Sequence, residues 1–306
     1  MSVNVRAFIP GGATDCSAGI QEAIDSLTDP SPGWPDESGG ELFFPAGQYR
    51  VSTIRFPIGN LTLRGEGGPG GEFQATHLIH IGEGPMFVFP YDAGRINDIC
   101  FRDMNLIGNR SGKDVAFELW SGSKFRRSFT WDRVGAMRFG RVIETCREGS
   151  LRWVGNLQIK GCNWSLNGQA IHAVETRING LSIIGSNIRK NSPPVDRGVI
   201  HLDHANSVAI ERNCLEGQRD TLFFDHGDSL IFSGNYLEGQ AGWVSLATGS
   251  HRILIGPNHY RILGSDEGGV GKFRFDRCDY INWPGWDRER YDFGDSTNVT
   301  PNPTVR

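Results

Sequence analysis

Residues 198–218 read GVIHLDHANSVAIERNCLEGQ, and residues 220–240 read DTLFFDHGDSLIFSGNYLEGQ. The two stretches match at an offset of 22 residues, with eight of 21 positions identical. Apolar residues alternate with others in both, which predicts strands rather than helices. A repeat in the low twenties is typical of a solenoid whose coils stack on one another. The repeat predicts an all-β parallel β-helix, with a core that includes Ile200, Leu202, Val208, Ile210, Leu222, Phe224, Leu230 and Phe232.

Asparagines recur through the chain at intervals that fit the same coil. Each follows a pair of alternating apolar residues, at Asn105, Asn163, Asn187, Asn213, Asn235 and Asn258. The last four intervals are 24, 26, 22 and 23 residues, and the 58 before them leaves room for two coils, one supplied by residues 125–144. Asparagine tolerates the left-handed conformation, and its amide can bond the same residue one coil away. We therefore expect coils of 22–26 residues and an asparagine ladder at one corner.

Composition limits the classes of function. The net charge of −4 provides no basic field, so nucleic acid is not an expected partner. No run of eighteen apolar residues exists, so no membrane span is expected, and the opening MSVNVR does not resemble a signal peptide. The six cysteines show neither zinc-ligand spacing nor a disulfide framework, which favours free thiols.

The N-terminal region carries a different pattern. Thr14-Asp15 precedes CSAGIQEAIDSL, which predicts an amphipathic helix over residues 15–27 that would cover the open end of the first coil. Residues 39–49 read GGELFFPAGQY. Together these motifs resemble the opening of the pectate-lyase-like superfamily, an aspartate-capped helix followed by Gly-Gly-x-Leu-x-Phe-Pro-Ala-Gly-x-Tyr. The resemblance is close over residues 5–65, whereas over the coils to about residue 263 only the general repeat pattern is shared. It implies a right-handed parallel β-helix.

We expect one structural domain with three parts. Residues 1–40 form the capping segment, residues 41–263 the β-helix, and residues 264–306 a C-terminal cap or interface. The last part contains FRFDRCDYINWPGWDRERYDFGD (273–295), which breaks the repeat. Its aromatic residues exceed what a cap needs and predict an exposed cluster that packs on a neighbouring subunit. The resemblance implies a homotrimer with parallel axes.

The resemblance also implies a carbohydrate substrate, without choosing the reaction. Three classes of function stay open. The first is a depolymerase that cleaves a bacterial or plant polysaccharide as a hydrolase or a lyase, as phage tailspikes do. The second is a fructan- or oligosaccharide-transforming enzyme, and the third is a non-catalytic carbohydrate-binding or structural spike. The protein would act on a virion tail or outside the cell if it comes from a phage, and in the cytoplasm otherwise.

One pair of carboxylates follows from the repeat. Asp203 alternates with the inward-facing Leu202, so its side chain points outward, and its repeat partner Asp225 does the same one coil later. Stacking in register separates them by one strand spacing, about 4.8 Å. A protonated and an ionised carboxylate side by side are what glycosidic bond cleavage requires. Asp203 and Asp225 are therefore the first candidates for the catalytic acid and its base or nucleophile.

A column of outward residues borders this pair. Its members hold equivalent places in successive coils: Glu144, His172, His201, Phe223 and Ser245. Trp243 should leave the same side and offer a flat ring for stacking on a sugar. Glu144, His172, His201 and Trp243 are therefore the predicted substrate-binding residues. In a lyase, His172, His201 or Lys190 would be the base that removes the proton from C5 of the sugar.

Glu216 and Glu238 form a competing catalytic pair at the corner of each repeat, with Arg189 one coil earlier. Two carboxylates this close must be paired with cations, share a proton or take part in catalysis. Repetition alone also stacks identical polar residues, so a structural role stays open for both pairs. His204 and His226 are expected to bond corner carbonyls. No cofactor and no metal site are expected, although Ca²⁺ would be needed if the chain were a calcium-assisted lyase.

Overall fold

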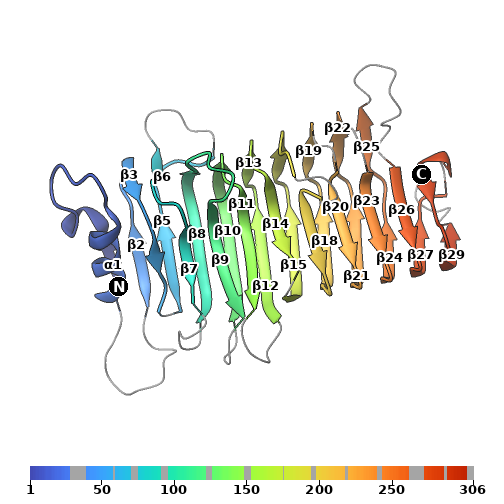
Figure 1. Cartoon of the computed structure of the whole chain (residues 1–306), viewed down its shortest axis with the longest axis horizontal. Coiled ribbons are helices and arrows are strands. Elements are labelled where there is room, and N and C mark those ends of the chain that lie inside the picture. The colour runs from blue at the N-terminus through green and yellow to red at the C-terminus, as the bar shows by residue number, and fades with distance from the viewer. Residues whose placement is uncertain are drawn as a thin grey trace.

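The computed structural model describes residues 1–27, 39–57, 59–69, 75–90, 96–121, 126–147, 153–174, 176–193, 198–217, 220–239, 243–261, 272–285 and 288–301. These residues form an elongated right-handed parallel β-helix, whose coils follow one another along the long axis from the N-terminal to the C-terminal end (Figure 1). The described strands make two sheets, one of 19 strands and one of ten. Among these residues, no helix is long and apolar enough to cross a membrane.

The ten-strand sheet carries the candidate site. Its members are β4 (Ile54–Arg55), β7 (Pro85–Phe89), β9 (Val115–Ser121), β11 (Arg141–Arg147), β14 (Gln169–Ala173), β17 (Ile200–Asp203), β20 (Leu222–Asp225), β23 (Trp243–Thr248), β26 (Lys272–Asp276) and β28 (Tyr291–Asp292).

The nineteen-strand sheet wraps the rest of the coil, because the long strands β8 and β10 bend around a corner and join two of its flanks. Its members are β1 (Ser2–Asn4), β2 (Gly40–Phe43), β3 (Gly47–Val51), β5 (Leu61–Arg64), β6 (Thr76–His80), β8 (Ile96–Ile107), β10 (Arg126–Met137), β12 (Trp153–Lys160), β13 (Asn163–Ser165), β15 (Arg177–Ile184), β16 (Asn187–Arg189), β18 (Asn206–Glu211), β19 (Cys214–Glu216), β21 (Asp228–Ser233), β22 (Tyr236–Glu238), β24 (His251–Ile255), β25 (His259–Arg261), β27 (Asp279–Trp283) and β29 (Thr297–Pro301).

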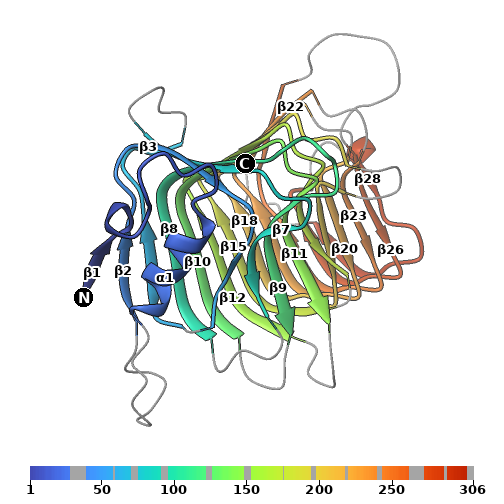
Figure 2. The same ribbon diagram turned by 60° about the vertical axis from the view of Figure 1, so that its left-hand side comes forward.

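The helix α1 (Ser17–Asp25) closes the N-terminal end of the solenoid (Figures 1 and 2). The carboxylate of Asp15 accepts a hydrogen bond from the backbone N–H of Ser17 at 2.8 Å, which satisfies one of the free donors of the first turn. Ile20, Ala23 and Ile24 are fully buried on its inner face. Two short 3₁₀ helices lie at Val5–Ala7 and Arg288–Arg290. The predicted capping helix is thus present and somewhat shorter than expected.

The predicted core is confirmed in the repeat region. Val208 is 1% exposed, and the other seven residues predicted to point inward are fully buried. Coil length varies more than the sequence suggested. The offset is 22 residues from Val208 to Leu230, but 30 from Ile99 to Phe129 and 28 from Phe129 to Leu157.

The asparagine ladder is confirmed at three positions and wrong at three. The backbone N–H groups of Asn213 and Asn235 each donate to the side-chain oxygen of the next asparagine, ending at Asn258. Further back the ladder continues through Ser186 and Cys162. The other three predicted members are in register with Cys214, the residue that follows Asn213, and so lie one position beyond the ladder: Asn105, Asn163 and Asn187. Ser186 bonds through its hydroxyl, which a search for asparagine could not detect.

The paired strands continue past residue 263, where the sequence led us to end the β-helix. The boundary itself lies outside the described residues, but β26, β27, β28 and β29 all pair in parallel with the preceding coil. The aromatic residues of this region do not form the exposed cluster that we expected. Four of them are buried because they stack along the coil axis: Phe273, Phe275, Trp283 and Tyr291. Tyr280 is exposed, and Trp286 lies outside the described residues.

Candidate functional site

The outward face of the ten-strand sheet holds a continuous column of titratable side chains. Register places Glu144 beside His172, His172 beside His201, and His201 beside Phe223. The rings of His172 and His201 meet edge to face with centroids 5.7 Å apart. Repeated side chains in the same place on successive strands produce such a column without any loop to position them. The expected column is therefore present over these four positions.

The column begins one coil earlier than the sequence analysis placed it. Glu118 on β9 pairs in register with Glu144 on β11. The indole N–H of Trp120 donates to Glu118 at 2.6 Å, and the guanidinium of Arg141 forms an ion pair with Glu144. Oxygens of Glu118 and Glu144 lie within 4.8 Å of each other. This carboxylate pair was missed, although Phe117-Glu118 repeats the pattern of Ile143-Glu144.

Asp203 and Asp225 are in register on β17 and β20, and imidazoles contact both carboxylates. Nε2 of His201 lies 3.3 Å from an oxygen of Asp225. Nδ1 of His204 and Nδ1 of His226 lie 2.7 and 3.1 Å from the same oxygen of Asp203. The expectation that these two histidines bond corner carbonyls is therefore wrong. Their rings stack with centroids 5.1 Å apart, because both occupy the left-handed corner position of adjacent coils.

The far end of the predicted column needs a correction. Ser245 pairs with Leu222 and is fully buried, so it does not lie on the outward face. Leu246 takes its place beside Phe223, because this coil is one residue longer than the preceding one. Trp243 is partly buried, and the guanidinium of Arg274 lies 6.0 Å from the centre of its ring. The column thus runs from the carboxylates of Glu118 and Glu144 through the two imidazoles to Phe223 and Leu246, and Arg274 follows Leu246 in register.

Glu216 and Glu238 lie in register on β19 and β22, at a different corner of the coil. Arg189 precedes them in the same column and Arg261 follows. The phenol of Tyr236 donates to Glu238 at 2.7 Å. Burial raises the pKa of the neighbouring Cys214 thiol, with a smaller contribution from Glu216. A cation in register with the two acids and a phenol that donates to one of them suit a structural role.

Among the described residues, two groups of side chains have donor atoms close enough to share a metal ion. They are Asp203, His204 and His226, and Glu118, Glu144 and Cys146, each with one donor atom per residue within 4.8 Å of the others. Imidazole and thiolate donors suit transition metals, whereas Ca²⁺ prefers oxygen ligands only. The ring nitrogens of the first group already contact Asp203. Neither group fits the all-oxygen site that a calcium-assisted lyase would need.

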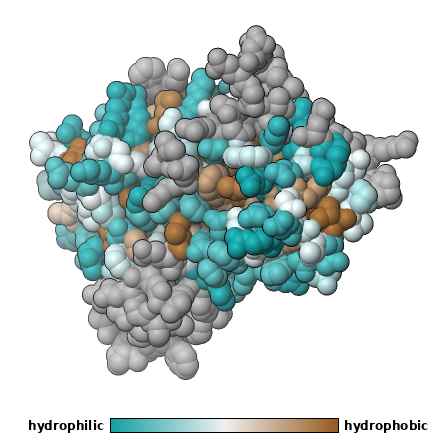
Figure 3. Space-filling model, turned by 45° about the vertical axis from the view of Figure 1, so that its right-hand side comes forward, coloured by the Kyte–Doolittle hydropathy of each residue, from teal (hydrophilic) through white to brown (hydrophobic). Residues whose placement is uncertain are grey.

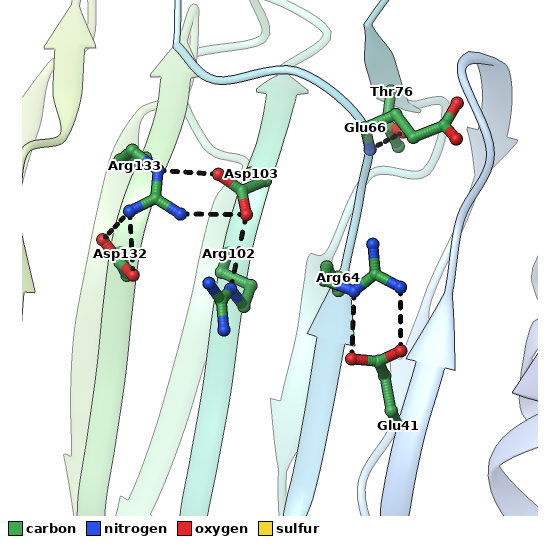
Figure 4. A network of polar contacts seen from close by, with 8 residues as sticks. All are labelled: Glu41, Arg64, Glu66, Thr76, Arg102, Asp103, Asp132 and Arg133. Atoms are coloured by element: carbon green, nitrogen blue, oxygen red, sulfur yellow. Dashed lines mark hydrogen bonds and ion pairs between the residues drawn. The ribbon is translucent and has the colours of Figure 1, made fainter. Parts of the chain in front are cut away.

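Charges on the nineteen-strand sheet are arranged differently (Figure 4). Arg64 donates two hydrogen bonds to the carboxylate of Glu41, at 3.0 and 2.9 Å. Arg133 makes the same kind of paired contact with Asp103, at 2.7 and 3.0 Å. The bonds from Arg64 hold the pKa of Glu41 below its usual value. These ion pairs are complete within the protein, which makes this face a poor candidate for a site.

Comparison with solved structures finds the same architecture in phage tailspike proteins and in an enzyme. The enzymatically active domain of tailspike protein 2 of bacteriophage CBA120 matches with a TM-score of 0.63 and 11% identity over 98% of this chain and 47% of that one. The tailspike protein of Acinetobacter baumannii phage AM24 matches with a TM-score of 0.62 and 12% identity over 100% and 55%. The fold that the chain shares with these proteins is a right-handed parallel β-helix. The chain spans about half the length of these two tailspike chains.

DFA-IIIase from Arthrobacter chlorophenolicus A6, solved in complex with GF2, matches over nearly its whole length. The TM-score is 0.57 and the identity 11%, over 99% of this chain and 91% of that one. No protein-family model matches the chain, and no curated protein matches it. At these identities the likeness shows the fold alone, and the chemistry must be argued from the residues.

Proposed function

We propose that the chain cleaves glycosidic bonds of a polysaccharide on the outward face of the ten-strand sheet. The observation that supports this most is the pair Glu118 and Glu144, with oxygens within 4.8 Å of each other. Retaining glycosidases place their two carboxyl groups about 5 Å apart. The pair opens a column of imidazoles and aromatic rings along one flank, which suits a long, linear substrate. Solved structures with the same fold include an enzymatically active tailspike domain and a DFA-IIIase.

The two carboxylates have different neighbours, as an acid and a nucleophile require. Glu118 accepts a hydrogen bond from the neutral indole of Trp120, whereas Glu144 faces the cationic guanidinium of Arg141. In the proposed reaction Glu118 donates its proton to the oxygen of the leaving sugar, and Glu144 attacks the anomeric carbon. Water then cleaves the glycosyl ester, with Glu118 now acting as the base. Trp120, half-buried beside the pair, offers its ring to a sugar face.

Asp203 and Asp225 are the second pair for the same reaction. They lie about three strand spacings, roughly 14 Å, further along the solenoid axis, where the partly exposed ring of Trp243 offers an apolar surface. Their contacts with three imidazoles favour a role in binding sugar hydroxyls. A lyase is the second candidate function, and the place of His172 between Glu144 and His201 supports it, since an imidazole there can remove a proton.

The test replaces each pair by its amides and follows cleavage of a panel of polysaccharides. We expect Glu118→Gln and Glu144→Gln each to lower kcat by about 10³-fold or more, with unchanged melting temperature. Asp203→Asn and Asp225→Asn should mainly raise KM, and Glu216→Gln and Glu238→Gln should change neither. New reducing ends without an unsaturated sugar indicate hydrolysis, and an unsaturated product indicates a lyase.

Two outcomes would contradict the proposal. If Glu118→Gln and Glu144→Gln keep wild-type rates on a glycan that the protein cleaves, the catalytic pair lies elsewhere. If the protein binds glycans of the panel and releases neither product, the chain is a binding module. In the first of these outcomes, Asp203→Asn and Asp225→Asn decide whether the second pair carries the chemistry, since a loss of rate confined to that pair assigns the reaction to it.

A further inference from the structure

A pocket of about 560 Å³ opens at a corner of the coil next to the Glu118 and Glu144 pair. Among the described residues, four cationic side chains line it: Arg110, Arg138, Arg141 and Lys190. We call this set the basic pocket. Its floor includes Phe139, Asn167 and Gln169, which are all at least 97% buried. The chain as a whole has a net charge of −4, so this concentration of cations does not follow from its composition.

The cations come from separate coils but reach one corner. Arg138, Leu166 and Lys190 follow three residues that are paired in register, so they hold the same corner position in successive coils. All three have positive φ, and the next two coils use Gly217 and Gly239 there. Side chains other than glycine, asparagine and aspartate are disfavoured in this conformation. The chain thus keeps long cationic side chains at two corner positions where glycine would be the easier choice.

The charges of the basic pocket are incompletely balanced. Arg141 forms an ion pair with Glu144, which links the pocket directly to the carboxylate pair. Within the part of the chain that the structure describes, no ion pair is found for Arg110, Arg138 or Lys190. Arg64 and Arg133 of the nineteen-strand sheet, by contrast, have bidentate carboxylate partners (Figure 4). Cations that converge over a buried floor produce a local positive field, because low-dielectric walls focus it.

The loop that carries Arg110 is held in place by a buried carboxylate. Asp114 accepts hydrogen bonds from the backbone N–H groups of Asn109 and Gly140, at 2.9 and 3.0 Å. The hydroxyl of Ser111 adds a third contact at 3.3 Å. These bonds fix the loop against the corner of the next coil, so the basic pocket is formed before any ligand binds.

We infer that the basic pocket binds an anionic group of the glycan, a uronate carboxylate or a sulfate ester, on the sugar next to the bond that is cleaved. Guanidinium groups recognise both oxyanions through paired hydrogen bonds. The inference rests on the proposed function and deepens it, because it makes the substrate an acidic polysaccharide. Arg141 then serves both sites, since it can hold the anionic group while it faces Glu144.

The test measures binding by calorimetry in the inactive Glu118→Gln variant, so that turnover does not interfere. The probes are an oligogalacturonate, a heparin oligosaccharide and a neutral maltooligosaccharide of equal length. We expect the charged probes to bind and the neutral one not to, with affinity that falls as salt is added. The double variant Arg138→Gln/Lys190→Gln should weaken binding about tenfold or more. A preference between the two charged probes distinguishes carboxylate from sulfate.

The matched control is Arg50→Gln/Arg212→Gln, which removes the same charge from exposed arginines outside the basic pocket. It should bind the charged probes like the parent. The inference is overturned if no charged probe binds, if the neutral probe binds equally well, or if the control weakens binding as much as the pocket variant. Charged-probe binding that depends on the pocket, in a wild-type protein that cleaves no glycan, would instead overturn the proposed function and leave the pocket standing.

Discussion

Asp114 shows how one buried residue can hold a site together. Its side chain has no exposed surface, and its oxygens accept from two backbone N–H groups of neighbouring coils. Burial alone would raise the pKa of Asp114, but the ring of His80 and these N–H groups outweigh burial and hold the pKa below 3.8. A group with a lowered folded-state pKa stabilises the protein above its unfolded pKa and loses that contribution as the pH falls through the folded pKa.

We therefore predict that Asp114→Asn destabilises the protein at neutral pH by about 1–3 kcal/mol, because the amide cannot accept from both backbone donors as the carboxylate does. Below pH 4 the parent loses this contribution, so the difference between parent and variant should shrink. Urea unfolding at neutral and acid pH measures both. The exposed Asp98 provides the control, since Asp98→Asn should change stability little at either pH. A difference that stays constant down to the acid range would contradict the assignment.

The sequence could predict the face of the strand on which a residue lies more readily than the side chains that the residue contacts. The alternation around Asp203 and Asp225 put both on the outward face, because a strand has a period of two residues. It did not reveal that His204 and His226 turn toward Asp203, which depends on their left-handed corner conformation. Glu118 was missed because its coil is 30 residues long and the repeat gives no register there. The basic pocket joins residues 110 and 190, and only stacking of the coils brings these together.

At the scale of elements, the corner ladder connects the coils. Asn235 is fully buried, its oxygen accepts from the N–H of Asn213, and its amide donates to Ile210 at 2.9 Å. Its backbone N–H donates in turn to Asn258. Each rung satisfies backbone groups that the turn leaves without a strand partner, so its loss exposes a buried donor and acceptor at once.

Asn235→Ala should therefore lower stability by about 2–4 kcal/mol, because it leaves the Asn213 N–H and the Ile210 carbonyl without partners. The midpoint of urea unfolding measures this. Asn187→Ala is the matched control: Asn187 lies one residue away from the ladder, and the oxygen of its side chain has no hydrogen bond to any described residue. Equal losses in the two variants would show that the ladder is not what stabilises the corner.

The elements that repeat were the ones that sequence could predict. Strands β17 to β22 come from two coils that match at an offset of 22 residues, and their register and buried residues followed from that match. The strands after residue 272 pair just as regularly, yet their sequence shares little with the repeat. We interpreted their aromatic residues as exposed because the pattern of the coil was not visible. Phe273 and Phe275 are in fact core residues, stacked on Tyr291 and Phe293.

The whole molecule presents chemically different flanks. The ten-strand sheet carries the carboxylate and imidazole column, and one corner carries the basic pocket. Near the C-terminal end, the nineteen-strand sheet exposes Ile231, Leu254 and Tyr280, which lie on neighbouring strands. Leu254 and Tyr280 line a hollow of about 710 Å³. On the face shown in Figure 3, hydrophobic residues form patches between hydrophilic ones. Exposed apolar side chains grouped in this way are typical of an interface.

We predict that the protein assembles as a homotrimer through this apolar flank, and not through the buried aromatic residues that first suggested it. Light scattering should give a mass three times 33.8 kDa, and Leu254→Asp/Tyr280→Asp should reduce it to that of one chain, because a buried unpaired carboxylate costs several kcal/mol at each of three contacts. Gln48→Asp, at an exposed position of β3 near the opposite end of the solenoid, is the control and should leave the mass unchanged. A wild-type mass of 33.8 kDa at micromolar concentration would rule out the trimer. A trimer that survives the double variant would place the interface on another flank. Slower hydrogen exchange at the basic pocket in that trimer than in a single chain would then show that the subunits meet at the glycan site.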